Sequence, residues 1–62
     1  MAHSLQYQIG DSIRTIEAEV GRLLDVVDAL KEAGNEELAA TILAQAHKIL
    51  EAAIALRIVA AG

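Results

Sequence analysis

The hydrophobic pattern of residues 12–33 predicts a long amphipathic helix. Large apolar side chains recur at spacings of three and four residues, which places them on one face of an α-helix. This stripe consists of Ile13, Ile16, Val20, Leu23, Val27 and Leu30, widened by Leu24. Polar residues, among them Glu17, Asp25 and Asp28, are expected on the far side. A smaller apolar strip beside the stripe is interpreted as a second contact line, made of Val26, Ala29 and Ala33.

Residues 36–61 predict a second long helix that is apolar along two separate lines. The first seam is Leu38, Ile42, Ile49, Ala53, Leu56 and Ala60, and the second seam is Leu43, Leu50, Ile54 and Ala61, flanked by Ile58. The seams lie roughly 100° apart, with Ala39 and Ala46 between them. A simple hairpin needs one apolar stripe on each helix. We therefore expect the stripe of the first helix to pack on Leu38, Ile42, Ile49 and Leu56, and the second seam to meet another chain.

The segment between the two helices predicts a tight turn over residues 34–35. Gly34 suits the left-handed position that follows a helix, and Asn35 suits the N-cap of the next helix. Glu36 and Glu37 then lie at the positive end of the second helix dipole. A loop this short makes the flanking helices antiparallel neighbours.

Residues 1–11 allow two interpretations. Gly10 followed by Asp11 and Ser12 resembles a helix end followed by a new N-cap, which predicts a separate short helix over about residues 3–9. The alternative is one continuous helix, because the apolar phase runs on from Leu5 and Ile9 into the stripe. We favour the break at Gly10.

Gly21, inside the first long helix, also has two interpretations. Glycine in a helix interior costs up to about 1 kcal/mol relative to alanine. The position is either tolerated at that cost, or it allows another backbone to approach closely.

The fold class is therefore predicted to be all-α. We expect an antiparallel helical hairpin with a short extra N-terminal helix, packed into a symmetric helical homo-oligomer. Such assembly is expected because a chain of 62 residues buries only about 60% of its unfolded surface and is marginal alone. The expected oligomer interface consists of Leu43, His47, Leu50, Ile54, Ile58, Ala61, Val26 and Ala29.

Composition narrows the function classes. The chain has no Cys, which rules out disulfides and thiol chemistry, and its net charge of −4 argues against a phosphate-binding surface. The apolar run at the C-terminal end is shorter than the roughly 20 residues of a membrane span. No secretory signal is visible. We expect a soluble cytoplasmic protein whose partners are copies of itself, without nucleic acid, membrane or small-molecule substrate.

Side chains with possible chemistry do not form a recognisable site. His47 and Glu51 are four residues apart and are able to share a metal, but such a pair is common by chance. An acidic row, on the side of its helix away from the stripe, reads as a solvated surface and consists of Asp25, Asp28 and Glu32. His3 lies near the terminus, and Tyr7 is expected to pack on a neighbouring helix. We expect no catalytic residues, no cofactor, no metal and no enzymatic activity.

Two resemblances follow from these features. The turn Gly34-Asn35-Glu36-Glu37, the core of Ala, Leu, Ile and Val alone, and the absence of Cys, Pro, Phe and Trp resemble de novo designed helical self-assembling proteins, either cyclic oligomers or cages. This resemblance implies that assembly is itself the function. In length and layout the chain also resembles, more weakly, the Rop helical hairpin, which dimerises and binds RNA. The chain lacks that family's basic and polar row, so no RNA-binding residue is carried over. The alternative function is a small regulator that docks a partner helix or RNA.

Overall fold

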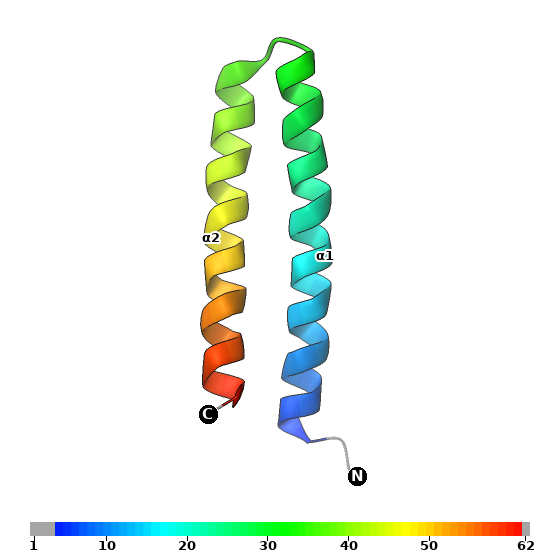
Figure 1. Cartoon of the computed structure of the whole chain (residues 1–62), viewed down its shortest axis with the longest axis vertical. Coiled ribbons are helices and arrows are strands. Elements are labelled where there is room, and N and C mark those ends of the chain that lie inside the picture. Colours follow the sequence, from blue (N-terminus) through cyan, green and yellow to red (C-terminus); the bar gives the residue numbers. More distant parts are fainter. Residues whose placement is uncertain (1–3, 62) are drawn as a thin grey trace.

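The computed structural model describes residues 4–61 as an antiparallel hairpin of two long helices (Figure 1). Helix α1 spans Leu5–Glu32 and helix α2 spans Glu36–Ala61. The two ends of the described chain lie at the same end of the hairpin, opposite the turn (Figure 1). The predicted all-α hairpin is confirmed. Its extents of 50 × 18 × 10 Å describe a long, flat molecule.

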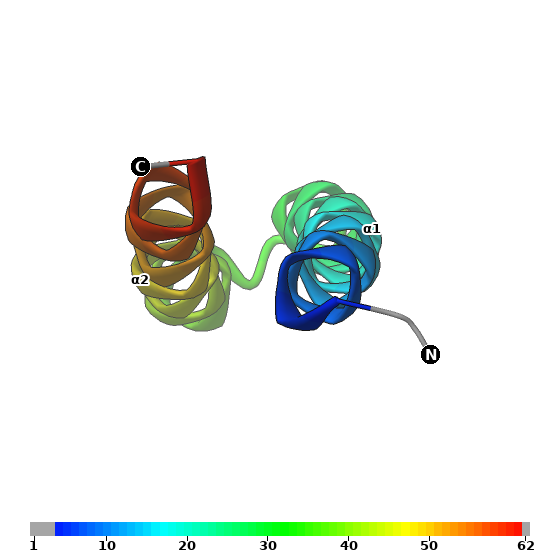
Figure 2. The same ribbon diagram turned by 90° about the horizontal axis from the view of Figure 1, so that it is seen from below.

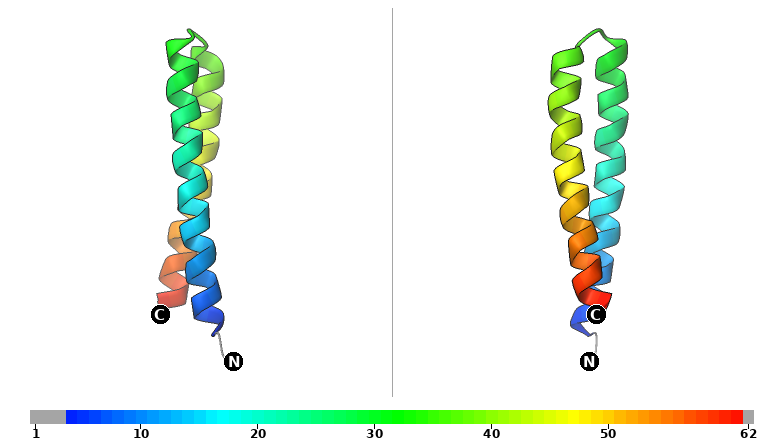
Figure 3. Two further views of the ribbon diagram at one scale, coloured as in Figure 1. Left: turned by 90° about the vertical axis from the view of Figure 1, so that its right-hand side faces the viewer. Right: turned by 60° about the vertical axis from the view of Figure 1, so that its left-hand side comes forward.

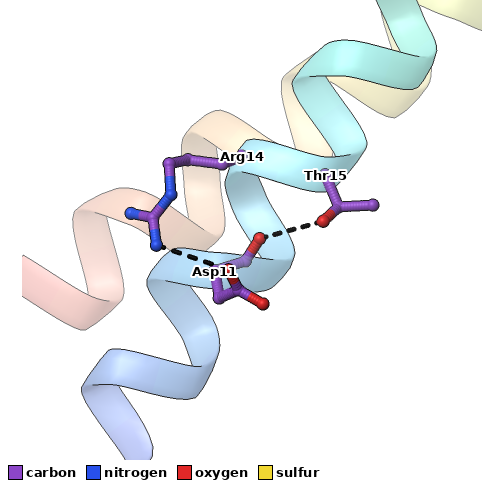
Figure 4. A network of polar contacts seen from close by, with 3 residues as sticks. All are labelled: Asp11, Arg14 and Thr15. Atoms are coloured by element: carbon purple, nitrogen blue, oxygen red, sulfur yellow. Dashed lines mark hydrogen bonds and ion pairs between the residues drawn. The ribbon is translucent and has the colours of Figure 1, made fainter.

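The prediction of a separate N-terminal helix is wrong, because α1 runs through Gly10 without a break and the described residues form no third helix. The helix begins after Ser4, whose side-chain oxygen accepts a hydrogen bond from the backbone N–H of Tyr7 (3.1 Å). Asp11 caps no new helix. Its carboxylate pairs with Arg14 (3.5 Å), and its carbonyl oxygen accepts a hydrogen bond from the Thr15 hydroxyl (3.1 Å) (Figure 4).

The turn between the helices closes with two backbone hydrogen bonds around a left-handed glycine. Gly34 has a φ of 83°, and its N–H donates to the carbonyl oxygen of Lys31 (3.0 Å). The N–H of Asn35 reaches back to the carbonyl oxygen of Leu30 (2.8 Å), which completes the pattern of a Schellman motif. Asn35 also caps α2, since its side-chain oxygen accepts the N–H of Leu38 (3.4 Å). The chain therefore reverses direction within three residues.

The core between the helices is narrow, and α2 contributes only alanines to its most buried part. The fully buried residues are Ile13, Val20 and Val27 of α1, and Ala39, Ala46 and Ala53 of α2. These two sets each repeat every seven residues, which is the spacing of a contact line between two helices that wrap around each other (Figure 3). We call the three residues of α2 the alanine line. Small side chains there let the branched residues of α1 approach the α2 backbone.

This arrangement corrects the predicted packing of α2. The first seam was expected to face α1, and of its residues Ala53 does so as part of the alanine line, whereas its large side chains flank that line. Leu38 is 44% exposed and Ile49 is 41% exposed, while Ile42 and Leu56 are half-buried. The large side chains of the two seams lie on either side of the alanines. Because the alanines face α1, the large side chains of both seams lie at the edges of the contact between the helices.

Candidate interaction surface

The hairpin is a single layer of two helices, as the view along its length shows (Figure 2). It therefore has two broad faces, and no other element of the described chain covers either of them. Helical domains normally bury their apolar sides between at least two layers. The side chains on the two broad faces are for this reason the candidates for a functional surface.

One broad face is marked by an ion pair between the two helices. Arg57 of α2 donates a hydrogen bond to the carboxylate of Glu17 in α1 at 2.7 Å. Glu17 had been expected on the far side of its helix, but it lies four residues after buried Ile13 and is half-buried beside the contact. Arg57 likewise lies four residues after buried Ala53. The residues four positions after each buried residue of α1 and α2 therefore lie on the same broad face of the hairpin. We call it the charged face.

The opposite broad face follows from the same helix geometry. A residue three positions after a buried one lies about 60° to one side of it, and a residue four positions after lies about 40° to the other side. In both helices, the residues three positions after a buried one therefore lie on the face opposite the Glu17–Arg57 pair. We call it the aliphatic face, and its residues are Ile16, Leu23 and Leu30 of α1, and Ile42, Ile49 and Leu56 of α2.

The two faces differ sharply in chemistry. All six residues of the aliphatic face are Leu or Ile, and five of them are half-buried while Ile49 is exposed. The corresponding six residues of the charged face are Glu17, Leu24 and Lys31 of α1, and Leu43, Leu50 and Arg57 of α2. Half of those carry charge. The aliphatic face is thus the more apolar of the two and runs along both helices.

The expected interface residues are spread over the charged face and the outer sides of the helices. Leu43 and Leu50 are half-buried on the charged face. Ile54 is 47% exposed and Ile58 is 67% exposed. The remaining four are all exposed, namely Val26, Ala29, His47 and Ala61. Every one of these side chains except Leu43 and Leu50 is open to a partner, and their role as an oligomer interface stays a prediction.

The polar candidates are dispersed over the surface. His47 and Glu51 are exposed on α2, and the acidic row on α1 is exposed along its whole length. The described residues contain no group of three His, Cys, Asp or Glu side chains close enough to hold a metal, and residues 4–61 enclose no detectable pocket. Tyr7 is exposed near the start of α1. His3 lies outside the described residues.

Neither α1 nor α2, as far as the described residues extend, has an apolar stretch long enough to cross a bilayer. Exposed apolar side chains and an elongated shape instead suggest a binding partner.

Comparison with known proteins gives no match, whether with protein-family models, with curated proteins or with solved structures. What the surface does has to be inferred from its own residues.

The prediction from sequence missed the aliphatic face, although its signal is present. Residues three positions after each member of the alanine line are aliphatic without exception. The same holds three positions after Ile13, Val20 and Val27. Recognising the face required knowing that the alanines, and not the leucines, point at α1.

Proposed function

We propose that the chain is a structural subunit that assembles with copies of itself into a symmetric homo-oligomer and carries out no catalysis. The observation that carries this proposal is the small size of the core. Six side chains of the described residues are buried, and three of them are alanine. Large aliphatic residues stay exposed on both helices, and we infer that a second copy of the chain supplies the second layer that a helical domain needs.

Physical chemistry favours assembly for a chain of this size. Fully burying one Leu or Ile contributes about 1.5–3 kcal/mol, and here most such residues are only partly buried. Oligomerisation is one of the ways in which chains of this size gain the missing stability. The chain has no Cys, so a disulfide is not available for that purpose.

The charges support a protein partner in preference to RNA. All three arginines lie in ion pairs with carboxylates: Arg14 with Asp11, Arg22 with Glu19, and Arg57 with Glu17. RNA binding requires clustered cations, and the net charge of −4 leaves the five Lys and Arg side chains outnumbered by nine carboxylates. The regular seven-residue repeats on both helices also support the resemblance to designed assembly subunits.

We assign the predicted interface seam of Leu43, Leu50, Ile54 and Ile58 to contacts between subunits. The test is the double variant Leu50→Glu with Ile54→Glu, compared with the wild-type chain by sedimentation velocity. Assembly through this seam predicts fewer chains in each particle of the variant, because two carboxylates then enter an apolar contact. A module that only docks a foreign helix keeps its mass unchanged, and that result would refute the seam as an interface between subunits.

A further inference from the structure

The broad side of the hairpin that carries the aliphatic face has an outline about as large as one side of a standard protein interface. Its outline is given by the two longer extents of the molecule, 50 Å and 18 Å, and their product is about 900 Å². A standard protein interface buries about 800 Å² on each partner. A globular monomer of 6.6 kDa exposes about 3,900 Å². The hairpin exposes 4537 Å², an excess of about 650 Å² over that globular reference.

The composition of this face suits a second copy of the same face. On this face, Ile16 lies at about the same height along the hairpin as Leu56, Leu23 as Ile49, and Leu30 as Ile42. We call each of these pairs a level, and the three levels are spaced seven residues apart. No charge lies on these six positions, so two copies meet without burying an unpaired charge. The middle level is Leu23 with Ile49, and a two-fold axis that passes near it brings all three levels of each copy into contact.

The charges along the hairpin decide the direction of the second copy. Residues 25–37, which form the turn and the adjoining ends of both helices, hold five acidic side chains and one basic side chain. The rest of the chain holds four acidic and four basic side chains and is neutral. The whole net charge of −4 therefore lies at the turn end of the molecule.

Two hairpins packed face to face have two symmetric choices. If their turns lie at the same end, two groups of charge −4 share one end of the bundle and repel each other, and this repulsion weakens as salt is added because the Debye length is about 10 Å at 0.1 M. If their turns lie at opposite ends, each acidic end lies beside a neutral end. The second arrangement avoids the repulsion and buries the same apolar surface.

We propose that a second copy of the chain covers the aliphatic face, with the two turns at opposite ends of an antiparallel four-helix bundle. This inference rests on the proposed self-assembly and specifies its first contact. The two-fold axis lies in the interface, perpendicular to the helices, so that α1 packs on the partner's α1 and α2 on the partner's α2. The charged face and the Ile54 side of α2 stay on the outside of the dimer, where they are available for larger assemblies.

A matched pair of substitutions tests which face is covered. Ile49 on the aliphatic face and Ile54 on the other side of α2 are 41% and 47% exposed, so Glu at either position costs the isolated hairpin about the same. We expect Ile49→Glu to abolish the dimer at concentrations where the wild-type chain is dimeric, with at least a tenfold weaker association. We expect Ile54→Glu to keep the dimer. Dimers in the Ile49→Glu variant, or their loss in Ile54→Glu alone, overturn the inference.

A distance measurement tests the direction without disturbing the face. The chain has no Cys, so Glu36→Cys at the start of α2 accepts a single spin label. Glu36 lies thirteen residues from Ile49, which places two labels about 40 Å apart when the turns are at opposite ends. Turns at the same end place the labels less than about 25 Å apart, because helices in a bundle lie 8–10 Å from their neighbours. Pulsed electron–electron double resonance separates the two values.

A second label position serves as the control for dimerisation. Lys48→Cys lies next to the middle level and is exposed, so its two labels are less than about 30 Å apart in either direction of packing. The expected result is a dipolar coupling between the two labels of Lys48→Cys, together with a distance of about 40 Å between the two labels of Glu36→Cys. A short distance at both positions overturns the antiparallel arrangement, and an odd number of chains in each particle overturns the dimer while leaving self-assembly in place. A folded monomer overturns self-assembly itself.

Discussion

Gly21 lies on an exposed part of α1, and a β-carbon added there meets no atom within 4 Å other than those of its chain neighbours and of the adjacent helix backbone. Within the hairpin, the close approach of another backbone is therefore not the reason for this glycine. Its conformation is helical, since the only positive φ among the described glycines belongs to Gly34. Gly21 therefore destabilises the helix, because glycine loses more backbone entropy than other residues when a helix forms.

We predict that Gly21→Ala stabilises the protein by about 0.5–1 kcal/mol, because alanine loses less backbone entropy when the helix forms. The measurement is the free energy of unfolding from urea denaturation. Gly34→Ala is the matched control and should destabilise the protein by about 1 kcal/mol or more, since its φ of 83° strains any residue with a β-carbon. A loss of stability in Gly21→Ala would indicate that a partner backbone contacts this position.

At the scale of the helices, the sequence is enough to predict two long helices and their antiparallel order, but not the face that α2 turns toward α1. The reason lies in the spacing of its residues. Ile49 and Leu50 are neighbours in sequence and lie on opposite sides of Ala46 and Ala53, so hydrophobicity alone favours either of two seams and overlooks the small residues between them. The face of α2 that packs on α1 depends on how closely the two helices approach each other. The spacing of hydrophobic residues in the sequence does not predict that distance.

The ends of the helices show the same limit. Gly10 and Asp11 carry the local signature of a helix end, yet α1 continues, because the apolar phase from Ile9 to Ile13 is uninterrupted. The Glu17–Arg57 pair joins residues forty positions apart. A pair so distant in sequence was not predictable, and yet it identifies which flanks share a face.

We predict that Ala53→Leu destabilises the protein by about 1–3 kcal/mol, because the larger side chain overpacks the contact between the alanine line and α1. Ala55→Leu is the control, since Ala55 is exposed on the same helix and leucine has a similar helix propensity. Both variants are compared by urea denaturation. Equal stabilities would mean that α2 does not turn its alanines toward α1.

At the scale of the whole molecule, the proposed self-assembly makes the stability of the two-helix layer depend on association. We predict that the midpoint of thermal unfolding rises with protein concentration, because a partner that binds only the folded chain stabilises it by mass action. Circular dichroism at about 5 μM and about 500 μM is the measurement. A midpoint that does not move across this range would show that the hairpin is stable without a partner.

The molar mass of the wild-type chain in solution, by light scattering after size exclusion, tests the central claim most directly. Each chain weighs 6.6 kDa. We expect a particle of four chains or a larger even number, since the aliphatic face joins chains in pairs and the seam of Leu43, Leu50, Ile54 and Ile58 joins the pairs. A helical particle with the mass of one chain would contradict self-assembly, because the aliphatic side chains of Ile16, Leu23 and Ile49 would then remain in contact with water.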